Sequence, residues 1–171
     1  TIKLIDLMKD MPKKPALMFS SSASVYGEPE TLPINEAAKK DPISPYGNTK
    51  YISELMFRDY ARAYGIDVMC FRYFNAAGAC PVTHDLGQEE NATHIIARVL
   101  EASLANKAFT INGDQFDTPD GTCIRDYVHV ADIADAHILS LNQLLVPRGI
   151  YNLGTAQGIS NLEVMRTAAH V

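Results

Sequence analysis

Tyr46 and Lys50 are the two residues whose types and spacing most directly suggest chemistry. They lie four positions apart in the segment Ser44-Pro45-Tyr46-Gly47-Asn48-Thr49-Lys50, and residues at i and i+4 share one face of an α-helix. A phenol and an ammonium group that point into one small volume form a candidate base, because a nearby cation favours the charged form of the phenol. A packing tyrosine beside a solvated lysine would give the same spacing, so the pair needs support from the elements around it.

The segments around this pair predict a β-α-β unit. Residues 16–19 form a short apolar run of the kind buried in parallel sheets, and hydroxyl side chains follow it at 20–24. Ser44 and Pro45 then begin an amphipathic helix that is predicted to end at Gly65, and residues 67–74 predict the next strand. Because strands joined in this way are parallel, we expect the serines and Tyr46 at the same edge of one sheet, where open α/β sheets bind ligands.

The remainder of the chain continues as an α/β pattern. Its apolar spacing and capping residues predict helices at 1–11, 93–104 and 131–145 and from Ser160, and strands at 108–112 and 149–153. Residues 122–130 form a compact segment that leads into the third of these helices.

Composition excludes several kinds of partner. The net charge is -5 and no Lys/Arg run occurs, so we expect no nucleic-acid partner. No apolar run approaches the roughly 18 residues that span a bilayer, so no membrane partner is expected. Cys70, Cys80 and Cys123 are odd in number and lack a C-x-x-C spacing, which predicts neither a disulfide framework nor a metal site and favours a reducing, cytoplasmic setting. His129 and His137 are interpreted as structural residues.

Four segments together resemble the extended short-chain dehydrogenase/reductase superfamily, and within it the UDP-glucose (UDP-galactose) 4-epimerases. These segments are 19–27, 44–50, 72–79 and 118–130, and their order and spacing fit along nearly the whole chain. The Y-x-x-x-K spacing alone is common, whereas the run D-G-T-C-I-R-D-Y-V-H-V is specific. The resemblance implies NAD as cofactor, a UDP-hexose as substrate and a homodimeric full-length protein.

The resemblance also implies a fold and domain limits. Residues 1–75 are expected to form the second half of a Rossmann-type parallel sheet, which binds the cofactor. Residues 76–171 are expected to form part of a smaller α/β substrate domain, with residues 128–150 packing back on the first domain.

Three residues match the catalytic positions of the family, and two more match positions that line the nicotinamide. Tyr46 matches the base that takes the proton from the sugar 4-hydroxyl, and Lys50 matches the residue that binds the nicotinamide ribose. Ser22 matches the hydroxyl that hydrogen-bonds the reacting oxygen. Tyr73 and Phe74 match the aromatic positions beside the nicotinamide ring, so these five residues form the expected cofactor-binding set.

Five residues match substrate-binding positions. Ser24 stands near the expected sugar, and Asn75 matches a donor to the UDP diphosphate. Arg125 matches the arginine that pairs with a phosphate oxygen, a role suited to a guanidinium fork. His94 and Ile95 fall where the family contacts the uracil and ribose.

Arg125 has an alternative role, and the chain departs from the family pattern in three places. Arg125 could instead form a surface ion pair with Asp120 or Asp126. Asn112 stands where these epimerases usually carry an aromatic residue, Ala97 stands where proline is usual, and the loop from Cys80 to Asn91 differs from the common pattern.

The implied reaction is the interconversion of UDP-glucose and UDP-galactose by transient NAD-dependent oxidation at C4. A Rossmann sheet needs a Gly-rich first turn to hold the pyrophosphate, but Gly27, Gly47 and Gly78 are isolated. We therefore expect the chain to be the central part of a longer protein and to be inactive alone.

Two other readings stay open. One is another nucleotide-sugar epimerase or a dehydratase of the same superfamily, although Ser22-Ala23-Ser24 stands where dehydratases carry an Asp-Glu pair. The other is a non-catalytic nucleotide-binding relative. The presence of a complete candidate base argues against it, because a protein that only binds has no need of one.

Overall fold

The computed structural model describes residues 1–80, 92–141 and 148–170, and the chain divides into two compact units. Unit 1 comprises Thr1–Phe74 and Ala134–Leu153, and unit 2 comprises Asn75–Ile133 and Gly154–Val171. The chain therefore leaves unit 1, forms most of unit 2 and returns. The assignment of the two parts to a cofactor domain and a substrate domain stays a prediction.

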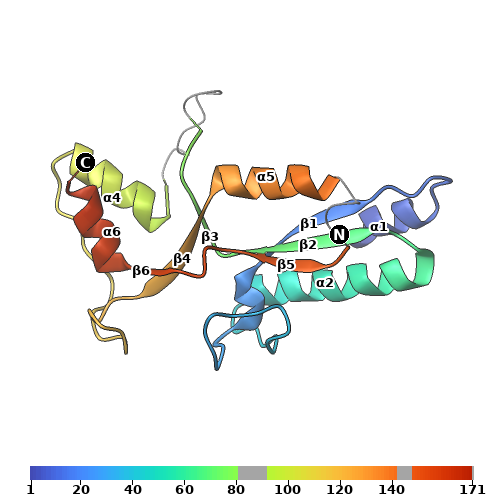
Figure 1. Cartoon of the computed structure of the whole chain (residues 1–171), viewed down its shortest axis with the longest axis horizontal. Helices are drawn as coiled ribbons and strands as arrows, with labels where there is room; N and C mark the ends of the chain where they lie inside the picture. The colour runs from blue at the N-terminus through green and yellow to red at the C-terminus, as the bar shows by residue number, and fades with distance from the viewer. Residues whose placement is uncertain (81–91, 142–147, 171) are drawn as a thin grey trace. The chain divides into compact units, whose positions relative to one another are not determined.

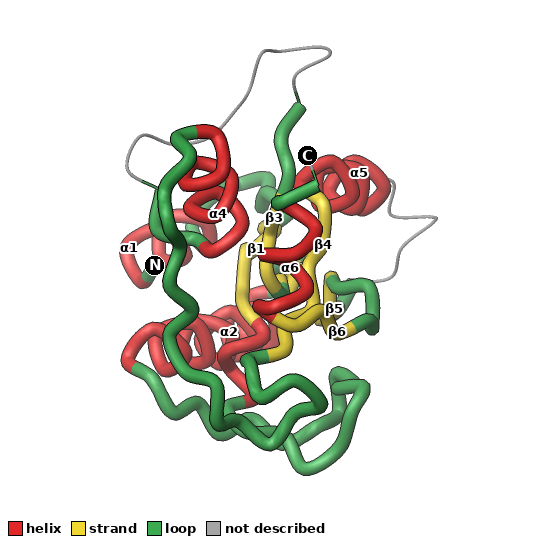
Figure 2. The backbone as a smooth tube through the Cα atoms, turned by 90° about the vertical axis from the view of Figure 1, so that its left-hand side faces the viewer, coloured by secondary structure: helices red, strands yellow, loops and turns green. Residues whose placement is uncertain are grey.

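Unit 1 is built on a parallel three-stranded sheet in the order β1-β2-β5. Its elements are α1 (Ile2–Lys9), β1 (Leu17–Ser22), the 3-10 helix η1 (Ala23–Tyr26), α2 (Pro45–Tyr64), β2 (Val68–Tyr73), α5 (Val130–Leu141, of which the part from Ala134 belongs to this unit) and β5 (Ile150–Leu153). Helices α2 and α5 lie on opposite faces of the sheet (Figures 1 and 2). The predicted parallel β-α-β arrangement is confirmed, since β1 and β2 pair in parallel from Leu17 to Ser22.

Helix α2 begins and ends as its sequence predicts. The Ser44 hydroxyl oxygen accepts a hydrogen bond from the Gly47 backbone N–H at 3.0 Å, and Pro45 occupies the first turn. Gly65 ends the helix in the left-handed region with φ of 66° and donates its N–H to the Ala61 carbonyl. These local signals fix the position of Tyr46 in the first turn.

The core of unit 1 lies between α1, α2 and the sheet. Ile5 and Met8 of α1 are buried against Phe57 of α2 and Ile66, which precedes β2. The ring of Phe19 meets that of Phe57 edge-on, with centroids 4.8 Å apart. The core therefore holds α2 against β1.

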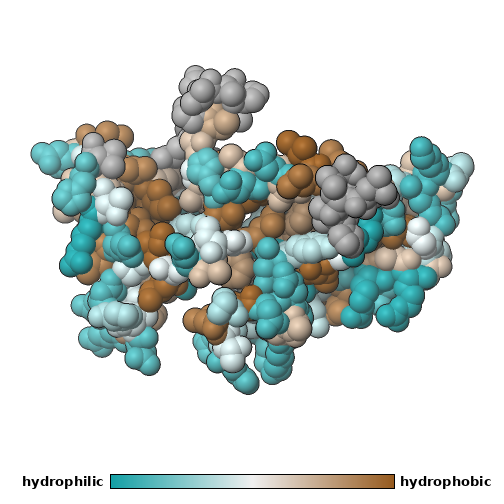
Figure 3. Space-filling model, in the orientation of Figure 1, coloured by the Kyte–Doolittle hydropathy of each residue, from teal (hydrophilic) through white to brown (hydrophobic). Residues whose placement is uncertain are grey.

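The outer sides of two helices remain apolar. Figure 3 shows apolar atoms over α5, where the exposed large apolar residues are Ile138, Leu139 and Leu141. Helix α1 likewise exposes Ile2, Leu4 and Leu7, whereas its Ile5 and Met8 are buried in the core. Both helices therefore carry exposed apolar side chains.

Unit 2 is a smaller mixed α/β structure. Its elements are β3 (Asn75–Ala77), α4 (Ile95–Leu104), β4 (Ile124–His129), β6 (Gly158–Ser160) and α6 (Asn161–Ala168), together with the first residues of α5. Strand β4 lies in the middle, parallel to β3 and antiparallel to β6. The α/β fold class predicted from the sequence is confirmed.

Unit 2 differs from the sequence predictions in three segments, which are residues 108–112 and strands β3 and β6. The strand predicted at 108–112 is wrong, because these residues have no ladder partner among the described residues and run as a loop. Strands β3 and β6 are not predicted, since three residues are too short for a period of two to be read. The end of the helix predicted to 145 and most of the loop from Cys80 to Asn91 lie outside the described residues.

The described residues contain neither a membrane-spanning helix nor a metal-binding cluster. None of the described helices is long and apolar enough to cross a bilayer. Within the same residues no group of three or more His, Cys, Asp or Glu side chains is arranged to hold a metal ion.

Cys70 on β2 is expected to be an unreactive thiol in the folded protein. Burial, with a smaller effect of the Glu54 carboxylate, raises its pKa to about 12, so the nucleophilic thiolate does not form near pH 8. Labelling with iodoacetamide at pH 8, followed by mass spectrometry, should modify Cys70 only after unfolding in urea, whereas the half-buried Cys123 serves as the internal reference. Equal labelling rates of the two thiols in the native protein would contradict this.

The same shift has a consequence for stability. Because the folded pKa of Cys70 lies above the ordinary thiol value of about 8.5, the protonated thiol favours the folded state. This contribution is full below that ordinary value and is lost as the pH rises through about 12.

Candidate active site

Tyr46 and Lys50 lie together at the start of α2. The Lys50 Nζ is 5.4 Å from the centroid of the Tyr46 ring and 5.2 Å from that of Phe19. It also donates a hydrogen bond of 2.7 Å to the backbone carbonyl of Ser20 on β1. Tyr46 is 57% exposed, so its phenol is accessible to a ligand while a cation stands beside its ring.

Ser22 and Ser24 are ordered by one another at the end of β1. The Ser22 hydroxyl oxygen accepts hydrogen bonds from the Ser24 backbone N–H at 3.2 Å and from the Ser24 hydroxyl at 3.0 Å. Ser22 therefore caps η1, a short helix that sequence patterns did not predict.

Gly47 allows the first turn of α2 to approach these serines. A Cβ atom at Gly47 would lie 2.6 Å from the backbone oxygen of Ser24, closer than real contacts allow. The structure thus brings the turn that carries Tyr46 directly against the end of β1.

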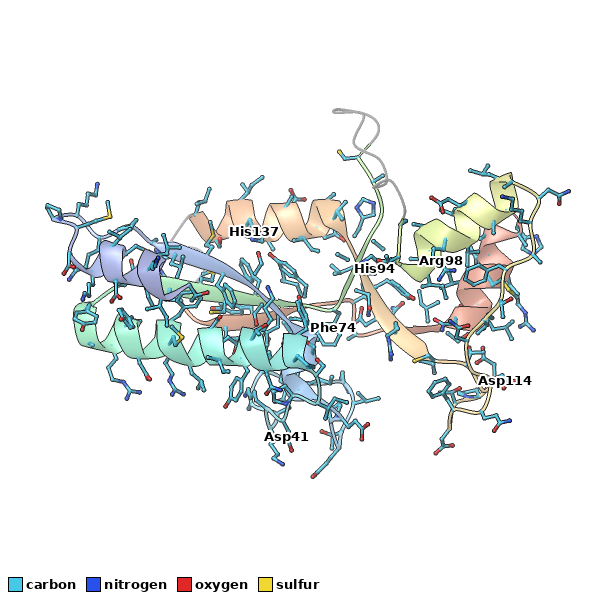
Figure 4. The ribbon with its side chains drawn as sticks, turned by 180° about the vertical axis from the view of Figure 1, so that it is seen from behind. Asp41, Phe74, His94, Arg98, Asp114 and His137 are labelled. Atoms are coloured by element: carbon cyan, nitrogen blue, oxygen red, sulfur yellow. The ribbon has the colours of Figure 1, made fainter. Side chains whose placement is uncertain are left out.

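Tyr73 is the last residue of β2 and Phe74 follows it, and the two lie in different surroundings. The Tyr73 hydroxyl lies 2.9 Å from the Ser20 hydroxyl and 3.0 Å from Nε2 of His137, which comes from α5 (Figure 4). Phe74 is half-buried, and its backbone N–H donates to the Leu153 carbonyl at 3.0 Å. Tyr73 is therefore fixed from the α5 side of the sheet.

A buried polar cluster that sequence reasoning missed lies on the α2 side of the same sheet. Arg72 is 1% exposed and Glu54 is 3% exposed. The guanidinium donates Nε–H to Oε1 of Glu54 at 2.9 Å and Nη2–H to Oε2 at 2.6 Å, and it donates Nη1–H to the Tyr26 hydroxyl at 2.7 Å. Burial opposes the charge on Arg72, but the bonds to Glu54 and Tyr26 outweigh it and raise the pKa of the guanidinium.

The feature of the sequence that could have indicated this buried cluster is the spacing of Glu54 from Lys50 and Tyr46. Glu54 follows Lys50 by four residues, and Lys50 follows Tyr46 by four, so the three side chains lie in one row along α2. An acidic residue at that position is equally typical of the exposed face of a helix. The sequence alone therefore did not predict that Glu54 is buried.

Arg125 of unit 2 has no acidic partner among the described residues. The Asp126 carboxylate instead accepts the backbone N–H and the hydroxyl of Thr155, each at 2.8 Å. The Asp120 carboxylate accepts a hydrogen bond from the Ser160 hydroxyl, which together with the bonds from Thr122 lowers the Asp120 pKa. Arg125 is exposed, and within the described residues its Nη1 donates only to the carbonyl of Ile124, at 3.1 Å, so its guanidinium remains available to an anion.

A cavity of about 200 Å³ lies near the start of α4. Ile95, Arg98 and Asn112 are among the residues that line it, and the Arg98 guanidinium lies 5.8 Å from the Phe109 ring. His94 is exposed immediately before the helix (Figure 4). Ile95 and Asn112 thus line the same cavity, and Asn112 is one of the positions at which the chain departs from the family pattern.

The Asn75 side chain uses part of its hydrogen-bonding capacity within unit 2. One of its amide hydrogens bonds the Asp126 carbonyl at 2.8 Å, so the other amide hydrogen and the side-chain oxygen are left for a ligand.

The sequence profile of the NAD dependent epimerase/dehydratase family matches residues 1–154. The chain belongs to this family. Among curated relatives, UDP-glucose 4-epimerase of Azospirillum brasilense is 46% identical over 158 residues, which is 91% of this chain and 45% of the relative. The chain thus spans about half the length of the relatives that it matches.

Solved structures of the epimerase/dehydratase family give the same result for the fold. UDP-glucose 4-epimerase of Brucella ovis in complex with NAD superimposes with a TM-score of 0.87 at 42% identity, covering 97% of this chain and 52% of that one. The Bifidobacterium longum enzyme in complex with NAD+ and UDP superimposes with a TM-score of 0.86 at 35% identity, covering 96% and 50%. Unit 1 is therefore part of a Rossmann-type fold.

Proposed function

We propose that the full-length protein is an NAD-dependent UDP-hexose 4-epimerase that interconverts UDP-glucose and UDP-galactose. The observation that carries the proposal is that Lys50 lies beside the exposed Tyr46 and bonds the end of β1, the strand that ends in serines. The kinship with UDP-glucose 4-epimerases supports the choice of substrate. A homodimer in a cytoplasmic setting is part of the same proposal.

The residues present fit the nicotinamide end of NAD. Lys50 uses one ammonium hydrogen on the Ser20 carbonyl, which leaves two for ribose hydroxyls. The accessible phenol of Tyr46 would stand at the same place, with Tyr73 and Phe74 following on the next strand. When bound, NAD supplies hydride acceptance and return at C4.

The proposed side chains then divide the reaction and the binding of substrate among them. Tyr46, as the phenolate, takes the proton from the sugar 4-hydroxyl and later returns it, which is general acid/base catalysis. Ser22 donates a hydrogen bond to the same oxygen, and Lys50 stabilises the charged phenol. Ser24 contacts the sugar, while Asn75 and Arg125 bind the diphosphate and His94 and Ile95 contact the uridine.

The reaction itself can be tested directly. The full-length protein should convert UDP-galactose to UDP-glucose without net consumption of NAD, as followed by chromatography of the nucleotide sugars. Binding of UDP-galactose without any product would overturn the proposal and favour the non-catalytic alternative. Release of a 4-keto-6-deoxy sugar would instead identify a dehydratase.

Arg125→Met is expected to weaken substrate binding more than catalysis. The variant loses a charge-assisted contact to the diphosphate, so the KM for UDP-galactose should rise about tenfold while kcat changes little. Steady-state kinetics of the full-length protein measure this. The control is Arg62→Met, which removes an exposed arginine in the last turn of α2; an equal change of KM in both variants would contradict the assignment.

A further inference from the structure

We propose that Glu54 and Arg72 are positioning residues for the reaction, acting through helix α2 to set Tyr46 and Lys50 against the end of β1. The inference rests on the proposed epimerase function. Neither residue is accessible to a substrate, since Glu54 is 3% and Arg72 1% exposed, so their effect on the reaction passes through the side chains that they hold.

The row Tyr46, Lys50 and Glu54 attaches α2 to β1 at two consecutive strand residues. Lys50 donates to the Ser20 backbone carbonyl at 2.7 Å, and one helical turn later Glu54 accepts the Ser21 hydroxyl at 2.5 Å. Two contacts one turn apart fix both the rotation and the axial position of a helix on a strand. The phenol of Tyr46, one turn before Lys50, takes its place from the same two contacts.

Arg72 in turn fixes the Glu54 carboxylate. Ser21 and Arg72 are direct partners in the β1-β2 ladder, and Asn152 of β5 is the next partner in the same row. The fork of Arg72 holds both oxygens of Glu54, and the Tyr26 hydroxyl joins Arg72 to Oδ1 of Asn152 at 2.7 Å. All three strands of the sheet therefore set the position of one carboxylate on α2.

A charged pair is a costly way to obtain stability alone. Desolvation of two buried ions often exceeds their attraction, and apolar side chains of similar volume often serve as well. Planar bidentate contacts, in contrast, fix direction as well as distance. The pair thus contributes geometry that an apolar contact between α2 and the sheet would not provide.

The test uses the full-length protein and the double variant Glu54→Met/Arg72→Met, which removes both charges together and leaves neither one buried alone. We expect kcat to fall about tenfold, because small misplacements of reacting groups strongly lower the rate of the chemical step. The KM for UDP-galactose should change less than about threefold. Ser21→Ala, which removes only the contact to β1, should lower kcat about threefold. The control Arg58→Met/Asp59→Met removes an exposed ion pair from the same helix, with side chains 58% and 63% exposed, and should leave kcat unchanged.

A purely structural role makes a different prediction. It would lower the melting temperature and the active fraction but leave the kcat per folded site and its pH profile as in the wild type. Positioning of Lys50 should instead move the acidic limb of the kcat profile to higher pH in the double variant, because the catalytic phenolate loses an aligned cation. The other charged groups near Glu54 and Arg72 are Lys40 and Glu36, and both are unchanged in these variants.

The possible outcomes distinguish failure of the positioning role from failure of the proposed function. A wild-type kcat and pH profile in the folded double variant would overturn the positioning role. If that variant does not fold, the same result in Ser21→Ala would overturn it. A wild-type protein without turnover would overturn the proposed function, and the positioning role with it.

Discussion

Tyr46→Phe is expected to lower the kcat of the full-length protein about 1,000-fold, which corresponds to roughly 4 kcal/mol of transition-state stabilisation. The phenylalanine ring preserves the shape of the side chain but cannot accept the proton of the sugar 4-hydroxyl. Because Tyr46 is 57% exposed, the change should leave the melting temperature within a few degrees of the wild type. Turnover and thermal unfolding measured on the same preparation check both statements.

The matched control for this variant lies on the same helix. Tyr64→Phe removes a phenol that is 41% exposed in the last turn of α2 and should leave kcat unchanged. Turnover of Tyr46→Phe at the wild-type rate would refute the assigned base, even if the protein is an epimerase.

Lys50→Met is expected to lower kcat about 50-fold. The Lys50 Nζ lies 5.4 Å from the centroid of the Tyr46 ring, and two opposite unit charges at about that distance attract by on the order of 3 kcal/mol at an effective dielectric constant of 20. Water screens part of this because Tyr46 is exposed. The variant also loses the bond to the Ser20 carbonyl and the proposed contacts to the ribose. NAD should consequently dissociate more readily, which can be measured by gel filtration with detection at 260 nm.

Lys39→Met is the corresponding control. Lys39 pairs with Asp41 on the surface, with side chains 79% and 67% exposed, and such pairs contribute little. A loss of activity in Lys39→Met as large as that in Lys50→Met would show that a general loss of positive charge, and not its position, is responsible.

Prediction from the sequence succeeded where the signals are local. Ser44, Pro45 and Gly65 set the limits of α2 within a few residues of themselves, and their contacts are those expected of caps. The i, i+4 spacing of Tyr46 and Lys50 likewise follows from helix geometry alone. Prediction failed at β3, β6 and residues 108–112, where the presence of a ladder partner decides the structure and short segments carry no period.

The sequence by itself therefore determined the α/β class, the β-α-β unit and the row that carries Tyr46 and Lys50. Only the tertiary structure decided which charges are buried and which remain available. Glu54 and Arg72 look like ordinary helix and strand residues until the chain folds, and Tyr26 meets Asn152 across 126 positions of sequence. Arg125 has no acidic partner within the described part of the chain, since Asp126 bonds a loop 29 residues further on. Such pairings depend on contacts distant in sequence, and no local pattern encodes them.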